Sequence, residues 1–174
     1  EIWSSLLNQH QNSILLIKSS IPADDKVYQK FNQKFQHFGI KQGRIKFMNR
    51  TKSMIDHLKM YNIVDIALDT FPFNGATTTF EALWMGVPVM TIEGNIHYSR
   101  VSTSILKVLE MDCCIAKNKD DFVTKAYELA NNTKKLKEFR QNLRKNLINS
   151  PLYDGKRFAM NVEKEYEKMF SNLK

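Results

Sequence analysis

The chain has 174 residues, 43% of them hydrophobic, which is enough for one well-packed core and too few for two ordinary domains. Its apolar runs, such as residues 14–17, are far shorter than the roughly 20 residues of a membrane-spanning helix, so no membrane span is predicted. The formal net charge of +8 could indicate nucleic-acid binding. Most of the excess lies from Asn131 to Lys174, where basic residues on helices are more often a solvated face.

Short β-rich runs alternate with helical patterns, which is typical of a parallel sheet covered by helices on both faces. In chain order the predicted strands are residues 13–18, 44–48, 64–69, 87–92 and 113–116, and the predicted helices are residues 1–9, 24–38, 53–61, 78–85, 98–109, 120–131, 134–147 and 156–170. The last three helices follow the final strand, and Ser150-Pro151 ends the middle one of them. The sequence therefore predicts one Rossmann-like, three-layer α/β domain over residues 1–174, with a parallel sheet of about five or six strands followed by C-terminal helices.

The two cysteines, Cys113 and Cys114, are adjacent in an apolar run. This position favours a buried strand in a reducing compartment, which predicts a cytoplasmic protein rather than a disulfide framework. The sequence has no metal-ligand spacing of cysteine and histidine. We therefore predict no metal site.

Residues 64–91 carry the most chemical information, because they predict a strand, a turn, a helix and a second strand. Ligands of open α/β sheets bind beyond the carboxyl ends of the strands. Gly75 lets the backbone approach a ligand closely, and the free N–H groups of the helix start form an anion site suited to a diphosphate. The hydroxyls of Thr77, Thr78 and Thr79 add donors to that site. Glu81, one turn further on, can accept hydrogen bonds from a ribose diol.

A purely structural interpretation competes with this one. Thr78-x-x-Glu81 is also a capping box, in which the threonine caps the helix start and the glutamate reaches back to the cap residue. On chemistry alone, capping is the stronger interpretation. Neither GxGxxG nor GxxxxGK[ST] occurs, so a dinucleotide or triphosphate site has no support from its usual motif.

The run LDTFPFNGATTTFEALWMGVPVMT, followed by Ser99-Arg100-Val101, resembles the O-GlcNAc transferase/Spindly-like family of glycosyltransferases. The resemblance extends over most of the chain. Its further matching positions, in order, are His57-Leu58, Val64-Asp65, Gly94, Ser104-Ile105-Leu106, Tyr127-Glu128-Leu129-Ala130, Arg140, Arg144, Ser150-Pro151-Leu152 and Glu163.

The family has two Rossmann-like halves with the active site in the cleft, and this chain looks like the C-terminal half, which binds the UDP part of UDP-GlcNAc. The resemblance implies diphosphate contacts for Gly75, Thr77 and Thr78, a ribose contact for Glu81, and a place near the uridine for His57. Animal members carry His and Asp where this chain has Ala76 and Glu81. The alanine removes one phosphate contact, whereas the glutamate keeps the carboxylate.

The resemblance also implies what this chain lacks. The family's catalytic lysine belongs to a segment N-terminal to Glu1, and Lys18 lies outside the matching motif, so we assign no catalytic residue. The acceptor-side half and the tetratricopeptide repeats are likewise expected outside this sequence. We expect the helix at residues 156–170 to pack against the missing half. In this chain alone it would then expose an apolar stripe formed by Phe158, Val162, Tyr166, Met169 and Phe170.

The predicted function is therefore donor binding, with a UDP-sugar, first of all UDP-GlcNAc, held for a protein O-glycosyltransferase that needs no cofactor or metal and modifies Ser or Thr. Its acceptor protein would bind through the missing half or repeats. The alternative is a non-catalytic nucleotide-binding or scaffold domain of the same fold. Nucleic acid is not a predicted partner, because aromatic residues are not interleaved with the basic ones. For Arg100, pairing with a phosphate and anchoring of a neighbouring loop or carboxylate remain equal alternatives.

Overall fold

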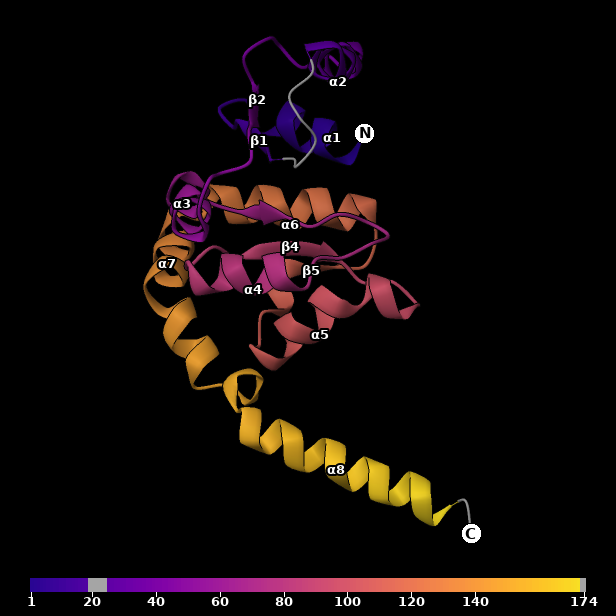
Figure 1. Cartoon of the computed structure of the whole chain (residues 1–174). Helices are drawn as coiled ribbons and strands as arrows, with labels where there is room; N and C mark the ends of the chain where they lie inside the picture. Colours follow the sequence, from indigo (N-terminus) through magenta and orange to yellow (C-terminus); the bar gives the residue numbers. More distant parts are fainter. Residues whose placement is uncertain (19–24, 173–174) are drawn as a thin grey trace.

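The strands form two parallel sheets in the computed structural model, which describes residues 1–18 and 25–172 (Figure 1). In the smaller sheet, β1 (Leu15–Lys18) pairs with β2 (Ile45–Met48). In the larger sheet, β4 (Val89–Ile92) lies between β3 (Ala67–Leu68) and β5 (Ile115–Ala116). All five strands were predicted from sequence and all are parallel, but the single sheet of about five or six strands is wrong. β3 is only two residues long and pairs on one side with β4, so among the described residues no strand ladder joins the two sheets.

Helices cover both faces of the larger sheet, as predicted. In Figure 1, α6 (Lys119–Asn131) lies on one side of β4 and β5, and α4 (Thr77–Trp84) and α5 (Val101–Val108) lie on the other. All four residues of β4 are buried, which is typical of a parallel strand covered twice. The fully buried side chains around it include Leu83, Met90, Leu106 and Phe122. This core fixes the carboxyl ends of β3 and β4.

The smaller sheet has its own hydrophobic cluster, formed by Leu7, Phe35 and Ile40 from α1 (Ile2–Gln9), α2 (Asp25–His37) and the following turn. Consecutive residues of α1 divide between the two clusters, since Leu6 belongs to the core of the larger sheet. Arg44 ties α1 to this unit by donating hydrogen bonds to the carbonyls of Leu7 and His10, at 2.9 and 2.8 Å. α1 is therefore the apolar link between the sheets.

The remaining helices are α3 (Met54–Lys59), α7 (Thr133–Ile148) and α8 (Gly155–Ser171), with short 3-10 helices η1 (Met60–Ile63), η2 (His97–Ser99), η3 (Asp112–Cys114) and η4 (Pro151–Tyr153). The predicted helices are confirmed within a few residues. The cysteine prediction needs correction. Both residues lie in η3 before β5, and only Cys114 is buried, whereas Cys113 is exposed. Neither forms a disulfide.

α7 packs against α4 (Figure 1), and Arg140 of α7 donates hydrogen bonds at the end of α4. The Arg140 guanidinium donates to the carbonyls of Tyr61 and Met85, at 3.2 and 2.8 Å, and to that of Val64. Gly86 ends α4 with a φ of +76°, and a Cβ there would lie 2.7 Å from the Arg140 carbonyl oxygen. Both the left-handed backbone and the close approach of α7 therefore require glycine.

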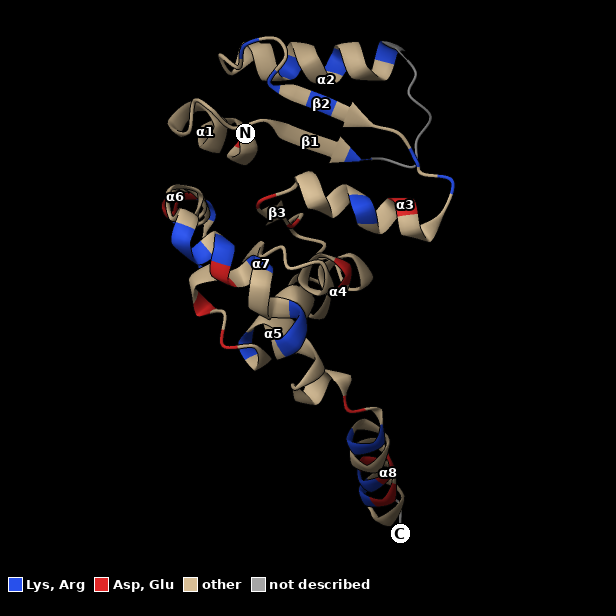
Figure 2. Cartoon of the chain, turned by 90° about the vertical axis from the view of Figure 1, so that its left-hand side faces the viewer, with Lys and Arg blue, Asp and Glu red and all other residues tan. Residues whose placement is uncertain are grey.

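The last helix, α8, extends away from the rest of the chain and has no buried residue (Figure 1). Its apolar side chains Phe158, Tyr166, Met169 and Phe170 are more than 60% exposed, as the sequence predicted for an uncovered stripe, while Val162 is half-buried. Figure 2 shows basic and acidic residues interspersed along this helix. No helix among the described residues is long and apolar enough to cross a membrane.

Candidate functional site

The turn that follows β3 is held by a single carboxylate, that of Asp69. One oxygen accepts hydrogen bonds from the backbone N–H of Thr70, at 3.0 Å, and from that of Gly75, at 2.8 Å. The other oxygen accepts from the Thr91 hydroxyl of β4, at 2.8 Å. Asp69 thereby fixes both ends of the turn over the carboxyl edge of the larger sheet, where ligands of open α/β sheets bind.

Gly75 leaves no room for a side chain. A Cβ at this position would lie 2.5 Å from the Thr78 hydroxyl oxygen and 2.9 Å from that of Thr79. Its carbonyl accepts a hydrogen bond from Ser102 of α5, at 3.0 Å. The glycine therefore packs the turn against the threonine hydroxyls and α5.

The three threonines of the motif divide into two kinds. Thr77 and Thr78 are exposed at the start of α4. Thr79 is 2% exposed, and its hydroxyl lies 2.9 Å from that of Ser102. Thr77 and Thr78 therefore present their side chains at the surface, while Thr79 supports the turn from beneath.

The predicted capping box is not formed, because it requires Thr78 at the cap position, two residues beyond the cap that α4 has. The cap position is Ala76, which has no side-chain cap, and Thr78 is already the second residue of the helix. Glu81 does not reach back to the helix start, since its carboxylate binds His57 instead. The first turn of α4 is thus left without a side-chain acceptor for its N–H groups, and these are the groups that attract an anion.

His57 of α3 joins the site to both sheets. Its Nε2 lies 2.9 Å from the Glu81 carboxylate, and its Nδ1 accepts a hydrogen bond from Lys18, the last residue of β1. The ring also packs edge-on against Tyr61, with centroids 5.7 Å apart. Glu81 therefore contributes a carboxylate whose position is set from one side by α3.

Burial changes the proton affinities of two neighbours of Glu81. Burial first, then the charge of Glu81 and a hydrogen bond to it, raise the pKa of Tyr61 to about 12, so the phenol stays protonated. Burial of the ammonium is also the main cause that lowers the pKa of Lys18, and Arg50 adds to this effect while Glu81 opposes it. Glu81 thus lies beside a phenol that stays protonated and an ammonium whose pKa is lowered.

Sequence reasoning placed His57, Gly75, Thr77, Thr78, Thr79 and Glu81 at one site, and the structure brings all six into one region around the start of α4. It missed Lys18, which was left aside because it lies outside the matching motif. A signal was available, since Lys18 ends a predicted parallel strand and the carboxyl ends of parallel strands share one edge. Sequence reasoning also missed Asp69 as the brace of the turn.

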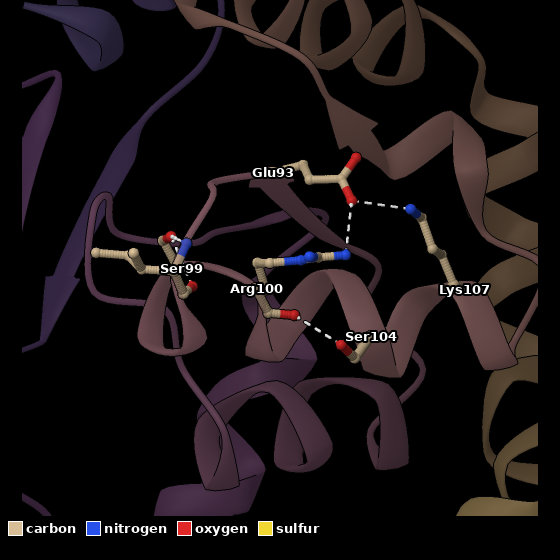
Figure 3. Close-up of polar contacts among 6 residues, drawn as sticks. Glu93, Ser99, Arg100, Ser104 and Lys107 are labelled. Atoms are coloured by element: carbon tan, nitrogen blue, oxygen red, sulfur yellow. Dashed lines mark hydrogen bonds and ion pairs between the residues drawn. The ribbon is translucent and has the colours of Figure 1, made fainter.

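Arg100 lies beside a carboxylate, as the anchoring alternative predicted, and pairing with a phosphate stays a prediction. It lies 3.8 Å from Glu93, the residue that follows β4, and Lys107 of α5 lies 2.8 Å from the same carboxylate oxygen (Figure 3). The hydrogen bond from Lys107, supported by both positive charges, lowers the pKa of Glu93. Nearby, a Cβ on Gly94 would collide with Ser99. This cluster therefore braces the loop between β4 and α5.

Two depressions of the surface lie away from this site. Two shallow depressions, of about 240 and 440 Å³, are lined by residues of α2 and β2 and by residues around η4, and none of the six site residues borders either. No group of three or more metal-ligating side chains occurs among the described residues.

The chain was compared with known proteins. The model of glycosyl transferase family 41 matches residues 1–162. A tomato (Solanum lycopersicum) protein named "Probable UDP-N-acetylglucosamine--peptide N-acetylglucosaminyltransferase SPINDLY" is 35% identical over 170 residues, which cover 98% of this chain and 18% of that protein. The Arabidopsis thaliana protein of the same name is 33% identical, over 98% of this chain and 19% of that protein.

A solved structure gives the same result in three dimensions. A mutant of the O-GlcNAc transferase of Thermobaculum terrenum superposes with a TM-score of 0.91 at 27% identity. The match covers 98% of this chain and 33% of that one. The chain thus spans about a fifth to a third of the length of the proteins it matches.

Proposed function

Because this chain belongs to glycosyl transferase family 41, we propose that it is the donor-binding part of a protein O-glycosyltransferase. The donor is a UDP-sugar, with UDP-GlcNAc the first candidate, since the SPINDLY relatives are named for that donor and for a peptide acceptor. The sugar would be transferred to Ser or Thr of a protein in the cytoplasm.

The observation that carries the proposal is the uncapped first turn of α4, with Thr77 and Thr78 exposed beside it and the Glu81 carboxylate one turn away. An open helix start with hydroxyl donors suits the diphosphate. The Glu81 carboxylate suits the ribose hydroxyls, which donate hydrogen bonds, and the His57 ring lies beside it for the base. Thr79 and Asp69 hold this arrangement without touching the donor.

We propose further that this chain alone does not transfer sugar. Transfer requires an acceptor held against the donor and stabilisation of the charge that develops on the departing diphosphate. The acceptor protein and the group that stabilises the leaving UDP would then bind or belong to parts of the protein beyond these 174 residues. The chain's own contribution is to bind and orient the nucleotide.

A titration of the purified chain with UDP, UDP-GlcNAc, UDP-glucose and GDP tests the proposal. Saturable 1:1 binding of UDP and UDP-GlcNAc, weaker for GDP, is the expected result. Tighter binding of GDP would move the donor assignment to a guanosine sugar. Absence of binding by any of the four would favour the alternative, a scaffold domain of the same fold that has lost its nucleotide. Transfer of sugar to a peptide by this chain alone would overturn the claim that it is incomplete.

A further inference from the structure

The two cysteines of the chain lie side by side in η3, with their sulfur atoms 3.8 Å apart. Their surroundings differ sharply. Cys113 is exposed to solvent, whereas Cys114 is fully buried in the core beneath the larger sheet. Small reagents can thus reach the Cys113 thiol, whereas the Cys114 thiol lies close to Cys113 but is shielded from solvent.

Positive charge gathers around this pair from two helices. Lys125 of α6 donates hydrogen bonds to the carbonyls of Asp112 and Ile115, on either side of the cysteines, and it also pairs with Asp121 at 3.7 Å. The positive charge of Lys135 on α7 lowers the pKa of Cys113. Ammonium groups beside a thiol stabilise its thiolate, which is the nucleophilic form.

The two thiols therefore hold their protons differently. The hydrogen bond from Cys114, with the charge of Lys135 adding to it and burial opposing, lowers the pKa of Cys113 to about 6. The same hydrogen bond, followed by burial, raises the pKa of Cys114. At neutral pH the exposed sulfur is mostly a thiolate and the buried one is a thiol that donates to it.

We propose that Cys113 and Cys114 form a redox-sensitive pair, in which Cys113 is oxidised by hydroperoxides and Cys114 captures the product as a vicinal disulfide. In the first step the Cys113 thiolate attacks the terminal oxygen of a hydroperoxide, the O–O bond breaks, and the alkoxide or hydroxide that leaves takes a proton from water. Cys113 becomes a sulfenic acid.

The second step follows from the loss of charge at Cys113. The neutral sulfenic acid no longer holds the Cys114 proton in place as the thiolate did, which removes the largest cause that raises the pKa of Cys114. The Cys114 sulfur, on losing its proton, attacks the Cys113 sulfur; the S–O bond breaks and water leaves with that proton. In total the two thiols are oxidised by two electrons, and the hydroperoxide is reduced to an alcohol and water, or to two waters when it is hydrogen peroxide.

Intact-protein mass spectrometry of the 174-residue chain after treatment with hydrogen peroxide tests this proposal. The chain should lose the mass of two hydrogen atoms without forming a dimer, and dithiothreitol should restore it. Fragmentation should place the change on the peptide that contains residues 113 and 114. Wild-type chain that keeps its mass, becomes a disulfide-linked dimer, or gains oxygen atoms irreversibly at Cys113 would overturn the proposal.

Two variants separate the steps. Cys114→Ala should stop at the sulfenic acid, which dimedone traps as an adduct on Cys113, and Cys113→Ser should show neither product. Alkylation of Cys113 by iodoacetamide provides a pH readout: its rate should reach half of its maximum near pH 6 in the wild type and at higher pH in Cys114→Ala, because the hydrogen bond from Cys114 is gone. Equal profiles for the two chains would contradict the role of Cys114.

Discussion

The Nε2 atom of His57 lies 2.9 Å from the carboxylate of Glu81, and this contact joins α3 to α4 beside the uncapped helix start. The pair is largely shielded, with side-chain exposures of 22% and 15%. The remaining lone pairs of the Glu81 carboxylate are thus held at a fixed position by a neighbouring helix. Preorganisation of this kind lowers the entropic cost of binding a diol.

Glu81→Gln should weaken UDP binding while leaving thermal melting unchanged. Glutamine keeps the shape and can still accept from His57, but it loses the negative charge that strengthens hydrogen bonds from the ribose. We expect a loss of roughly 1.5 kcal/mol, or about tenfold in affinity, by calorimetric titration. Glu163→Gln, on the exposed surface of α8, is the control and should bind UDP like the wild type. An unchanged UDP affinity in Glu81→Gln would contradict the assignment of the ribose contact to this carboxylate.

Thr78→Ala and Thr79→Ala should behave in opposite ways, although the residues are adjacent. Thr78 is exposed and does not cap α4, so its loss should leave the melting temperature unchanged and weaken UDP by about ten- to a hundredfold. Thr79 is buried against Ser102, so its loss should lower the free energy of unfolding by about 1–3 kcal/mol. Thermal melts and UDP titrations of both variants measure the contrast. Loss of stability in Thr78→Ala with normal UDP binding would restore the capping interpretation.

Gly75→Ala should impair both the turn and the donor site. The added methyl group would lie 2.5 Å from the Thr78 hydroxyl, so that hydroxyl or the turn must move. We expect a loss of about 1–3 kcal/mol in the free energy of unfolding, together with weaker UDP binding. Gly155→Ala is the matched control, because nothing lies within 4 Å of its Cβ position. A Gly75→Ala chain with wild-type melting and affinity would show that this close packing has no role.

Arg140→Lys should destabilise the fold without a direct effect on the nucleotide. The two terminal nitrogens of the Arg140 guanidinium donate to three carbonyls in different segments. The single ammonium nitrogen of a lysine cannot reach all three. We expect a loss of about 1–2 kcal/mol in chemical denaturation. Arg157→Lys on α8 should cost nothing measurable, because the only hydrogen bond that Arg157 donates within the described residues is made by its backbone N–H, to Asp154. Equal denaturation midpoints for the two variants would mean that the three hydrogen bonds of Arg140 contribute little to the free energy of unfolding.

Removal of residues 155–174 should leave the melting of the remaining chain nearly unchanged. No residue of α8 is buried, so its deletion removes little hydrophobic burial, and we expect a change within about 0.5 kcal/mol. Thermal melts of the two lengths measure this. A clearly lower midpoint for the shorter chain would show that α8 packs on its own chain in solution.

Much of the fold follows from local patterns in the sequence. The strands and α-helices of the described residues depend on periodicity, glycine and proline, and these are visible without a structure. The pairing of strands is not local. β1 and β2 form a separate sheet because β3 offers only Ala67 and Leu68 for pairing, and nothing in the run 64–69 reveals how short that strand is.

The candidate site shows the same division. Its residue types could be recognised in order along the chain, but which threonine faces outward depends on where α4 begins and on how it packs against α5. Thr78 becomes exposed and Thr79 buried, and the capping box disappears. The contact between Lys18 and His57 depends on how two segments 39 residues apart meet in space, which a motif cannot express.

The chain of contacts from Lys18 through His57 to Glu81 crosses from the smaller sheet to the larger one. A nucleotide that binds beside His57 and Glu81 would therefore occupy the seam between the two units and would act as a bridge between them. The cooperativity of unfolding would then depend on the ligand. Amide hydrogens of β1 and β2, which belong to the smaller sheet, should exchange more slowly when the nucleotide is bound, although the proposed nucleotide contacts lie mainly on the larger unit.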